Sequence, residues 1–158
     1  MPGVKIGCCG WSWFRAKDFF GLDWRVKYKS VLQAYAAMYP VVEINSTFYR
    51  IPKLQTAEKW REQADGVNKD FEFTVKCSQL VTHKIRFGRG SVRVFELMKD
   101  ICKALDAKLL LLQSPASFKP SKENIKRMEE FFNSIKTVSY THLRAHETRH
   151  DLVCRLLL

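Results

Sequence analysis

Hydrophobic positions along residues 1–137 follow two alternating spacings. Short apolar runs, typical of buried strands, precede segments in which apolar residues recur every three or four positions, the spacing of a helix face. We expect four strands, at Val4–Cys9, Val41–Asn45, Phe71–Lys76 and Ala107–Gln113. The last of these contains four consecutive leucines, a pattern that favours burial on both faces.

A helix is predicted after each strand. The first ends before Pro40, the second spans Leu54–Gln63 behind Pro52, and the fourth is capped by Ser121. The apolar faces of the first, third and fourth helices consist, in chain order, of Val31, Leu32, Tyr35, Ala36 and Met38, then Val94, Phe95, Met98, Ile101, Cys102 and Leu105, then Ile125, Met128, Phe132 and Ile135.

This alternation of strands and helices predicts an α/β fold with a parallel sheet and helical crossovers. Each of the four βα units has about 34 residues, which is close to the spacing in a (βα)8 barrel of ~250 residues. We therefore predict the N-terminal half of a (βα)8 TIM-like barrel, truncated after four units. A doubly wound sheet is the alternative, but Gly7, Gly10 and Gly21 do not form the glycine-rich phosphate turn that favours it.

Composition excludes several protein classes. The 158 residues are 46 % hydrophobic and 27 % charged, as in one globular domain. No apolar run approaches the ~18 residues of a membrane span, and the first strand begins too early to leave room for a signal peptide. Five cysteines, two of them adjacent at Cys8 and Cys9, favour reduced thiols in a cytoplasmic protein over a disulfide scaffold.

The last part of the chain differs from the rest. Val138–Thr148 and Leu152–Leu158 resemble one reading frame of a sequencing adapter, separated by a gap the length of an index. We therefore divide the chain into a partial barrel domain, residues 1–137, and a non-native tail, residues 138–158, expected to lack native structure. The tail contains His142, His146 and His150, whose spacing of four suggests a metal site only if the tail is authentic.

Four segments carry a family resemblance, and they read IGCCGWS, VVEINSTFYRIP, FEFTVKCSQLVTH and LLLLQSPASFKP. In this order and spacing they resemble the barrel family called domain of unknown function 72, the YecE-like proteins, over roughly Val4–Thr137, and archaeal members most closely. The resemblance implies a TIM-like barrel related to sugar isomerases, whose biochemical role is unsettled. The second half usual in the family is missing, so we expect this fragment to be inactive.

Candidate catalytic residues lie where the strands end, because barrel enzymes place their chemistry there. Glu43, inside an apolar strand, is a candidate general base; alternatively it forms a structural ion pair with Lys76. Lys76 can stabilise negative charge or form a Schiff base, although most surface lysines do neither. His83 can act as an acid or base near neutral pH; alternatively it is solvated or caps a turn.

Further residues are expected to hold a ligand, and they are Trp11, Asn45, Tyr49, Gln113, Arg86 and Arg89. Asn45 and Tyr49 offer amide and phenol groups suited to a polyhydroxyl compound, although Asn45 can equally pin the turn that follows it. The segment 73–95 contains no acidic residue, and Gly88 and Gly90 allow close approach of an anion such as phosphate. It can equally be a solvated basic loop.

These residues together predict that the protein binds or acts on a small polar or anionic metabolite. Sugar or sugar-phosphate isomerase-like chemistry would use Glu43 as the base and Lys76 or His83 as charge stabiliser or acid. No cofactor, metal or membrane partner is expected. Cys8 and Cys9 cannot bind one metal ion together, because neighbouring residues of a strand point to opposite faces, and we expect both to be buried. The alternative is binding or processing of nucleic acid by the basic loop Lys76–Arg93, which the net charge of +11 for the full chain also permits, although the lysines and arginines are scattered.

Overall fold

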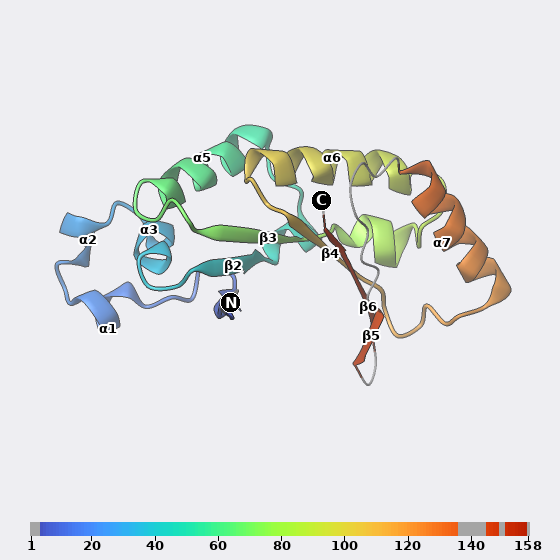
Figure 1. The fold of residues 1–158 in the computed structure, drawn as a ribbon, viewed down its shortest axis with the longest axis horizontal. Helices are drawn as coiled ribbons and strands as arrows, with labels where there is room; N and C mark the ends of the chain where they lie inside the picture. The colour runs from blue at the N-terminus through green and yellow to red at the C-terminus, as the bar shows by residue number, and fades with distance from the viewer. Residues whose placement is uncertain (1–3, 136–144, 149–150, 158) are drawn as a thin grey trace.

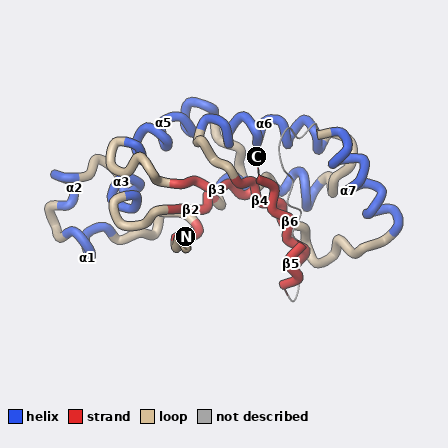
Figure 2. Tube along the Cα trace, in the orientation of Figure 1, coloured by secondary structure: helices blue, strands red, loops and turns tan. Residues whose placement is uncertain are grey.

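The computed structural model describes residues 4–135, 145–148 and 151–157. The four predicted strands are present as β1 (Gly7–Cys9), β2 (Val41–Ile44), β3 (Glu72–Lys76) and β4 (Leu109–Gln113). They form a parallel sheet whose strand order follows the sequence, and the strands run across the centre of Figure 2. The predicted α/β class is confirmed.

The predicted helices are also present, together with shorter ones that the sequence pattern does not show. In chain order the helices are α1 (Ala16–Phe20), α2 (Trp24–Lys27), α3 (Val31–Ala36), α4 (Ser46–Tyr49), α5 (Leu54–Asp65), the π-helical turn η1 (Leu80–Lys84), α6 (Ser91–Ala104) and α7 (Lys122–Ser134). Ser121 caps α7 as predicted, because its Oγ accepts a hydrogen bond from the Asn124 amide. None of the helices within the described ranges is long and apolar enough to cross a lipid bilayer.

The core lies between the sheet and one helical layer. Figure 1 shows α5 and α6 running along the same side of β2–β4. Alternate strand residues point into this layer and are almost fully buried, namely Val42, Ile44, Phe73, Val75, Leu110 and Leu112. They pack with helical residues such as Ala57, Phe95 and Met98 in one hydrophobic cluster. The intervening strand residues therefore occupy the opposite face of the sheet.

Three predictions about burial are wrong. Met38 is 42 % exposed because α3 ends at Ala36, before the helical spacing reaches it. Ile125 is 45 % exposed, since α7 turns Phe131 and Ile135 toward the core instead. Cys8 and Cys9 are both exposed, because β1 is the edge strand and α5 and α6 lie over its neighbours.

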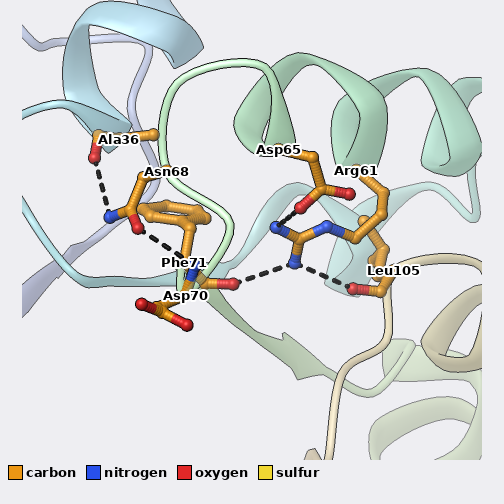
Figure 3. Close-up of polar contacts among 7 residues, drawn as sticks. All are labelled: Ala36, Arg61, Asp65, Asn68, Asp70, Phe71 and Leu105. Atoms are coloured by element: carbon orange, nitrogen blue, oxygen red, sulfur yellow. Dashed lines mark hydrogen bonds and ion pairs between the residues drawn. The ribbon is translucent and has the colours of Figure 1, made fainter.

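A single arginine joins three elements where β3 and β4 begin (Figure 3). The guanidinium of Arg61, on α5, donates to the carbonyl oxygen of Phe71 at 2.9 Å and of Leu105 at 3.4 Å. It also pairs with the Asp65 carboxylate at 2.5 Å and lies 5.0 Å from the centre of the Phe73 ring. Arg61 therefore fixes α5 against the start of β3 and the end of α6.

Two further strands, β5 (Ala145–Thr148) and β6 (Asp151–Leu157), lie within the segment predicted to be a non-native tail. They pair antiparallel with each other, and β6 pairs antiparallel with β4, for example Gln113 with Val153. Origin of this segment from a sequencing adapter stays a prediction. His142 and His150 lie outside the described residues, and the side chain of His146 is not described.

Candidate functional site

The carboxyl ends of β1, β2 and β3 bring polar side chains together on the sheet face opposite α5 and α6. In the parallel register Cys9 lies beside Glu43, and Glu43 lies beside Thr74. Lys76 is two residues beyond Thr74 and therefore points to the same face. We call Cys9, Glu43, Asn45 and Lys76 the strand-end cluster.

Electrostatic interactions connect all four members of this cluster. The Cys9 Sγ lies 3.7 Å from Glu43 Oε1, within hydrogen-bond distance for sulfur. Desolvation against the sheet and then the negative charge of Glu43 raise the pKa of the Cys9 thiol above 9.0. A hydrogen bond from Asn45 and the positive charge of Lys76 act in the opposite direction. The other three side chains therefore all act on the proton of the Cys9 thiol.

Lys76 does not form the structural ion pair with Glu43 that was the alternative prediction. Among the described residues no Glu43–Lys76 contact is short enough for an ion pair. The Lys76 Nζ instead lies 4.8 Å from the centre of the Phe48 ring, a cation–π contact. The carboxylate of Glu43 and the ammonium of Lys76 therefore lie on the same face of the sheet, and each acts on the Cys9 thiol.

Phe48, on α4, also brings His83 toward this site. The His83 ring meets the Phe48 ring edge to face, with 4.9 Å between the ring centres. The Nδ1 of His83 lies 2.8 Å from the Thr82 hydroxyl, so the ring is held at its position in η1. Phe48 therefore has Lys76 and His83 as neighbours, and the three catalytic candidates Glu43, Lys76 and His83 lie around the ends of β2 and β3.

Asn45 lies between β2 and α4, and its side chain does not cap that helix. Its Oδ1 is buried and has no hydrogen-bond partner among the described residues. Buried polar atoms of native proteins nearly always have a partner, so such an atom calls for an explanation. The observation does not favour the alternative that Asn45 pins the following turn, because the Thr47 hydroxyl occupies that role.

Thr47 joins the two strand ends that carry the cluster. It is fully buried, and its Oγ1 lies 2.6 Å from the Ile44 carbonyl oxygen and 2.7 Å from that of Lys76. The hydroxyl can donate to either carbonyl at the ends of β2 and β3. This contact fixes the end of β3, at Lys76, relative to the end of β2, the strand that carries Glu43.

Thr47→Val is therefore expected to lower the free energy of unfolding by about 1–2 kcal/mol, because it removes the buried hydroxyl that donates to one of the two strand-end carbonyls. The measurement is urea unfolding followed by circular dichroism. Thr74→Val on β3 is the matched control, since the Thr74 hydroxyl makes only a 3.5 Å contact with the Val42 carbonyl. Equal losses in the two variants would contradict this role of Thr47.

Three other residues expected to bind a ligand, Trp11, Tyr49 and Gln113, are not members of the strand-end cluster. Trp11 turns back into the helical layer, where it packs edge-on against Trp60 at 5.2 Å and Phe73 at 6.4 Å between ring centres. Tyr49 is 75 % exposed, whereas Gln113 is half-buried at the end of β4. Trp11 therefore lies outside the strand-end cluster, and the Tyr49 ring packs edge-on against Phe48, with 5.0 Å between the ring centres.

The basic loop after η1 reaches toward the loop after β4. Arg86 donates to the Ser117 hydroxyl at 3.2 Å, and Arg89 is exposed in the same loop. Arg86 and Phe87 both have positive φ, 51° and 57°, an uncommon conformation for residues other than glycine. Burial of the Phe87 ring against Phe131 holds this turn in place. The loop thus presents guanidinium groups at the carboxyl ends of β3 and β4.

Two members of the site were not predicted to belong to it, Cys9 and Phe48. Cys9 was expected to be buried, and only the pairing register of β1 with β2 places it next to Glu43. Phe48 was not singled out, although its place in the STFY segment after Asn45 puts it at a strand end. Within the described ranges no three potential ligands are grouped so as to hold a metal ion.

Comparison with known proteins identifies one family. A family model described as "Protein of unknown function DUF72" matches residues 5–152, which includes part of the predicted tail. No curated protein matches the chain. A crystal structure of a DUF72 family protein from Enterococcus faecalis V583 at 3.10 Å resolution is similar, with a TM-score of 0.59 and 19 % identity, covering 86 % of this chain and 48 % of that chain.

A second crystal structure of a DUF72 family protein from Enterococcus faecalis V583, at 2.52 Å resolution, has a TM-score of 0.55 and 21 % identity, covering 70 % of this chain and 45 % of that chain. The present chain thus spans about half the length of the solved structures that it matches. At these identities the likeness shows a shared fold.

Proposed function

The chain belongs to the DUF72 family, and we propose that it forms half of a (βα)8-like barrel that binds a small, polar, anionic metabolite at the carboxyl ends of its strands. The strand order β1-β2-β3-β4 supports the barrel, because a doubly wound sheet reverses its strand order at a switch point. The placement of α5 and α6 on one face supports it too, since a doubly wound sheet carries helices on both faces. A cytoplasmic location is part of the proposal and is supported by the free thiols of Cys8, Cys9, Cys77 and Cys102.

The observation that carries the binding proposal is the buried Oδ1 of Asn45, which lies beside Cys9, Glu43 and Lys76 and has no hydrogen-bond partner in the described part of the chain. A hydroxyl group of a polyhydroxyl ligand would donate to this oxygen and remove the cost of leaving it unpaired. The Glu43 carboxylate would accept a second hydroxyl. Arg86, with Arg89 in the same loop, would hold an anionic group such as phosphate.

The same arrangement suits proton transfer between adjacent carbons, as in an aldose–ketose isomerisation. Glu43 would take the proton from the carbon next to a carbonyl, and the C–H electron pair would form the C=C bond of an enediolate. The carbonyl π electrons would move to oxygen, where the Lys76 ammonium would stabilise the negative charge. Glu43 would then return the proton to the former carbonyl carbon. His83 would move the remaining hydroxyl proton from the oxygen of the first carbon to the oxygen of the former carbonyl carbon, so that the new carbonyl forms on the first carbon.

Binding is the appropriate test, since the chain spans about half the length of the solved structures that it matches. We expect glucose 6-phosphate to bind more tightly than glucose or inorganic phosphate in isothermal titration calorimetry. Lys76→Met and Glu43→Gln are each expected to weaken binding about 10-fold or more, the effect of losing one charge-assisted hydrogen bond.

Glu58→Gln and Lys59→Met on α5 are the matched controls, because both residues are exposed and lie on the helical layer. They should leave the affinity unchanged. The proposal fails if none of the three probes binds, or if the two pairs of variants have the same effect.

The acid-free basic loop supports a second function, nucleic-acid binding. This function predicts that the affinity for a single-stranded oligonucleotide falls steeply as the salt concentration rises, because binding releases counterions from the phosphates. Absence of oligonucleotide binding at about 50 mM salt would eliminate this function.

A further inference from the structure

We propose that Cys9 and Glu43 act as one hydrogen-bonded pair, in which the thiol donates to Glu43 Oε1 and positions that carboxylate as the base of the proposed site. The inference rests on the proposed function for its role, but the pair itself can be observed without a ligand. The direct observation is the 3.7 Å distance between Cys9 Sγ and Glu43 Oε1.

Backbone pairing sets this contact. Cys9 is the last residue of β1, and its Cα is directly opposite that of Glu43 in the parallel ladder. Side chains at paired positions of neighbouring strands point to the same face. A cysteine has only one side-chain dihedral before its sulfur, so the strand backbone limits the sulfur to a few staggered positions. The sheet therefore places Cys9 and Glu43 side by side, and the rotamers of the two side chains complete the contact.

The surroundings keep the proton on sulfur near neutral pH. The groups facing the thiol come from two neighbouring strands and the residue after one of them: Glu43 on β2, Asn45 after β2 and Lys76 on β3. Desolvation and Glu43 favour the neutral thiol, and they outweigh Asn45 and Lys76, so the pKa of Cys9 is raised above 9.0. A neutral thiol is a hydrogen-bond donor, whereas a thiolate is not.

The donated hydrogen bond has a consequence for Glu43. One carboxylate oxygen is occupied by the thiol, which leaves Oε2 as the oxygen free to take the substrate proton. Rotation of the carboxylate would break the contact with sulfur, so Cys9 holds one orientation of the base. Cys9 is in this sense a positioning residue, and its proton stays on sulfur throughout.

The test is the pH dependence of Cys9 alkylation by iodoacetamide, followed by peptide mass spectrometry in a Cys8→Ser background. Thiolate is the reactive form, so the midpoint of the rate profile reports the pKa of Cys9. We expect a midpoint above 9.0. Glu43→Gln should lower this midpoint because it removes the negative charge and the acceptor, and Lys76→Met should raise it. Glu58→Gln on α5 is the matched control and should leave it unchanged.

A merely structural role of Cys9 would not predict opposite shifts in the Glu43 and Lys76 variants. The proposal is overturned if the Glu43→Gln midpoint equals that of the parent chain. Shifts as expected without any binding of glucose 6-phosphate would refute the proposed function and leave the pair standing. Binding of glucose 6-phosphate together with an unshifted midpoint would refute the pair alone.

Discussion

Replacing Arg61 by methionine is expected to lower the free energy of unfolding by about 2–4 kcal/mol, because it removes the shared donor of two backbone carbonyls. The Arg61 side chain is only 15 % exposed, so water cannot easily replace its hydrogen bonds to Phe71 and Leu105. Methionine keeps much of the apolar stem, which isolates the loss of the guanidinium. Urea unfolding monitored by circular dichroism gives the free energy.

Arg127→Met on α7 is the matched control. Arg127 also pairs with a carboxylate one helical turn away, Glu123, but both side chains are well exposed. Exposed ion pairs of this kind contribute little, so we expect a change of about 0.5 kcal/mol or less. Similar losses for Arg61→Met and Arg127→Met would show that the contacts in Figure 3 do not stabilise the fold.

The long elements could be predicted because their apolar positions recur over several turns or strand residues. The second helix was predicted at Leu54–Gln63 and spans Leu54–Asp65, and Ser121 caps the last one as expected. The short helices α1, α2 and α4 contain too few residues for such a period to emerge. Their positions depend on turns and on aromatic contacts such as that between Phe14 and Tyr35.

Those residues of the site that lie at the carboxyl ends of strands could be predicted from the sequence. Glu43, Asn45, Lys76 and His83 were singled out because strand ends carry barrel chemistry, and the structure places them around the ends of β2 and β3. The neighbours of these residues were not predictable, since pairing register and the path of the chain after each strand set them. Register makes Cys9 the partner of Glu43, and the path of the chain after β1 places the partly buried Trp11 against the core.

Alkaline pH is expected to unfold the protein, because three buried groups keep their protons to a higher pH in the folded chain than in the unfolded chain. Burial raises the pKa of the Cys77 thiol, near Cys102, from 9.0 to about 12, and that of Cys102 likewise from 9.0 to about 12. Burial also raises the pKa of Tyr35 from 10.0 to about 12; its hydroxyl accepts from the Cys8 amide and donates to the Val41 carbonyl. The unfolded chain loses these protons at lower pH than the folded chain does.

Because these pKa values are raised in the folded chain, stability falls as the pH rises. Stability contributed by each thiol is complete below about pH 9 and is lost as the pH rises toward 12. The rise of each thiol pKa from 9.0 to about 12 corresponds to roughly 4 kcal/mol by the end of this window. Since native domains are stable by about 5–15 kcal/mol, losing both contributions is expected to unfold the chain.

Thermal melting between about pH 7 and pH 11 measures this loss. We expect the melting temperature of the parent chain to fall steeply above about pH 9. The double variant Cys77→Ala, Cys102→Ala should begin lower, because it creates cavities, but should fall less steeply, because the two titrating thiols are gone. Cys8→Ser, at an exposed position, should keep the slope of the parent. Equal slopes in the parent and the double variant would show that these buried thiols do not cause alkaline unfolding.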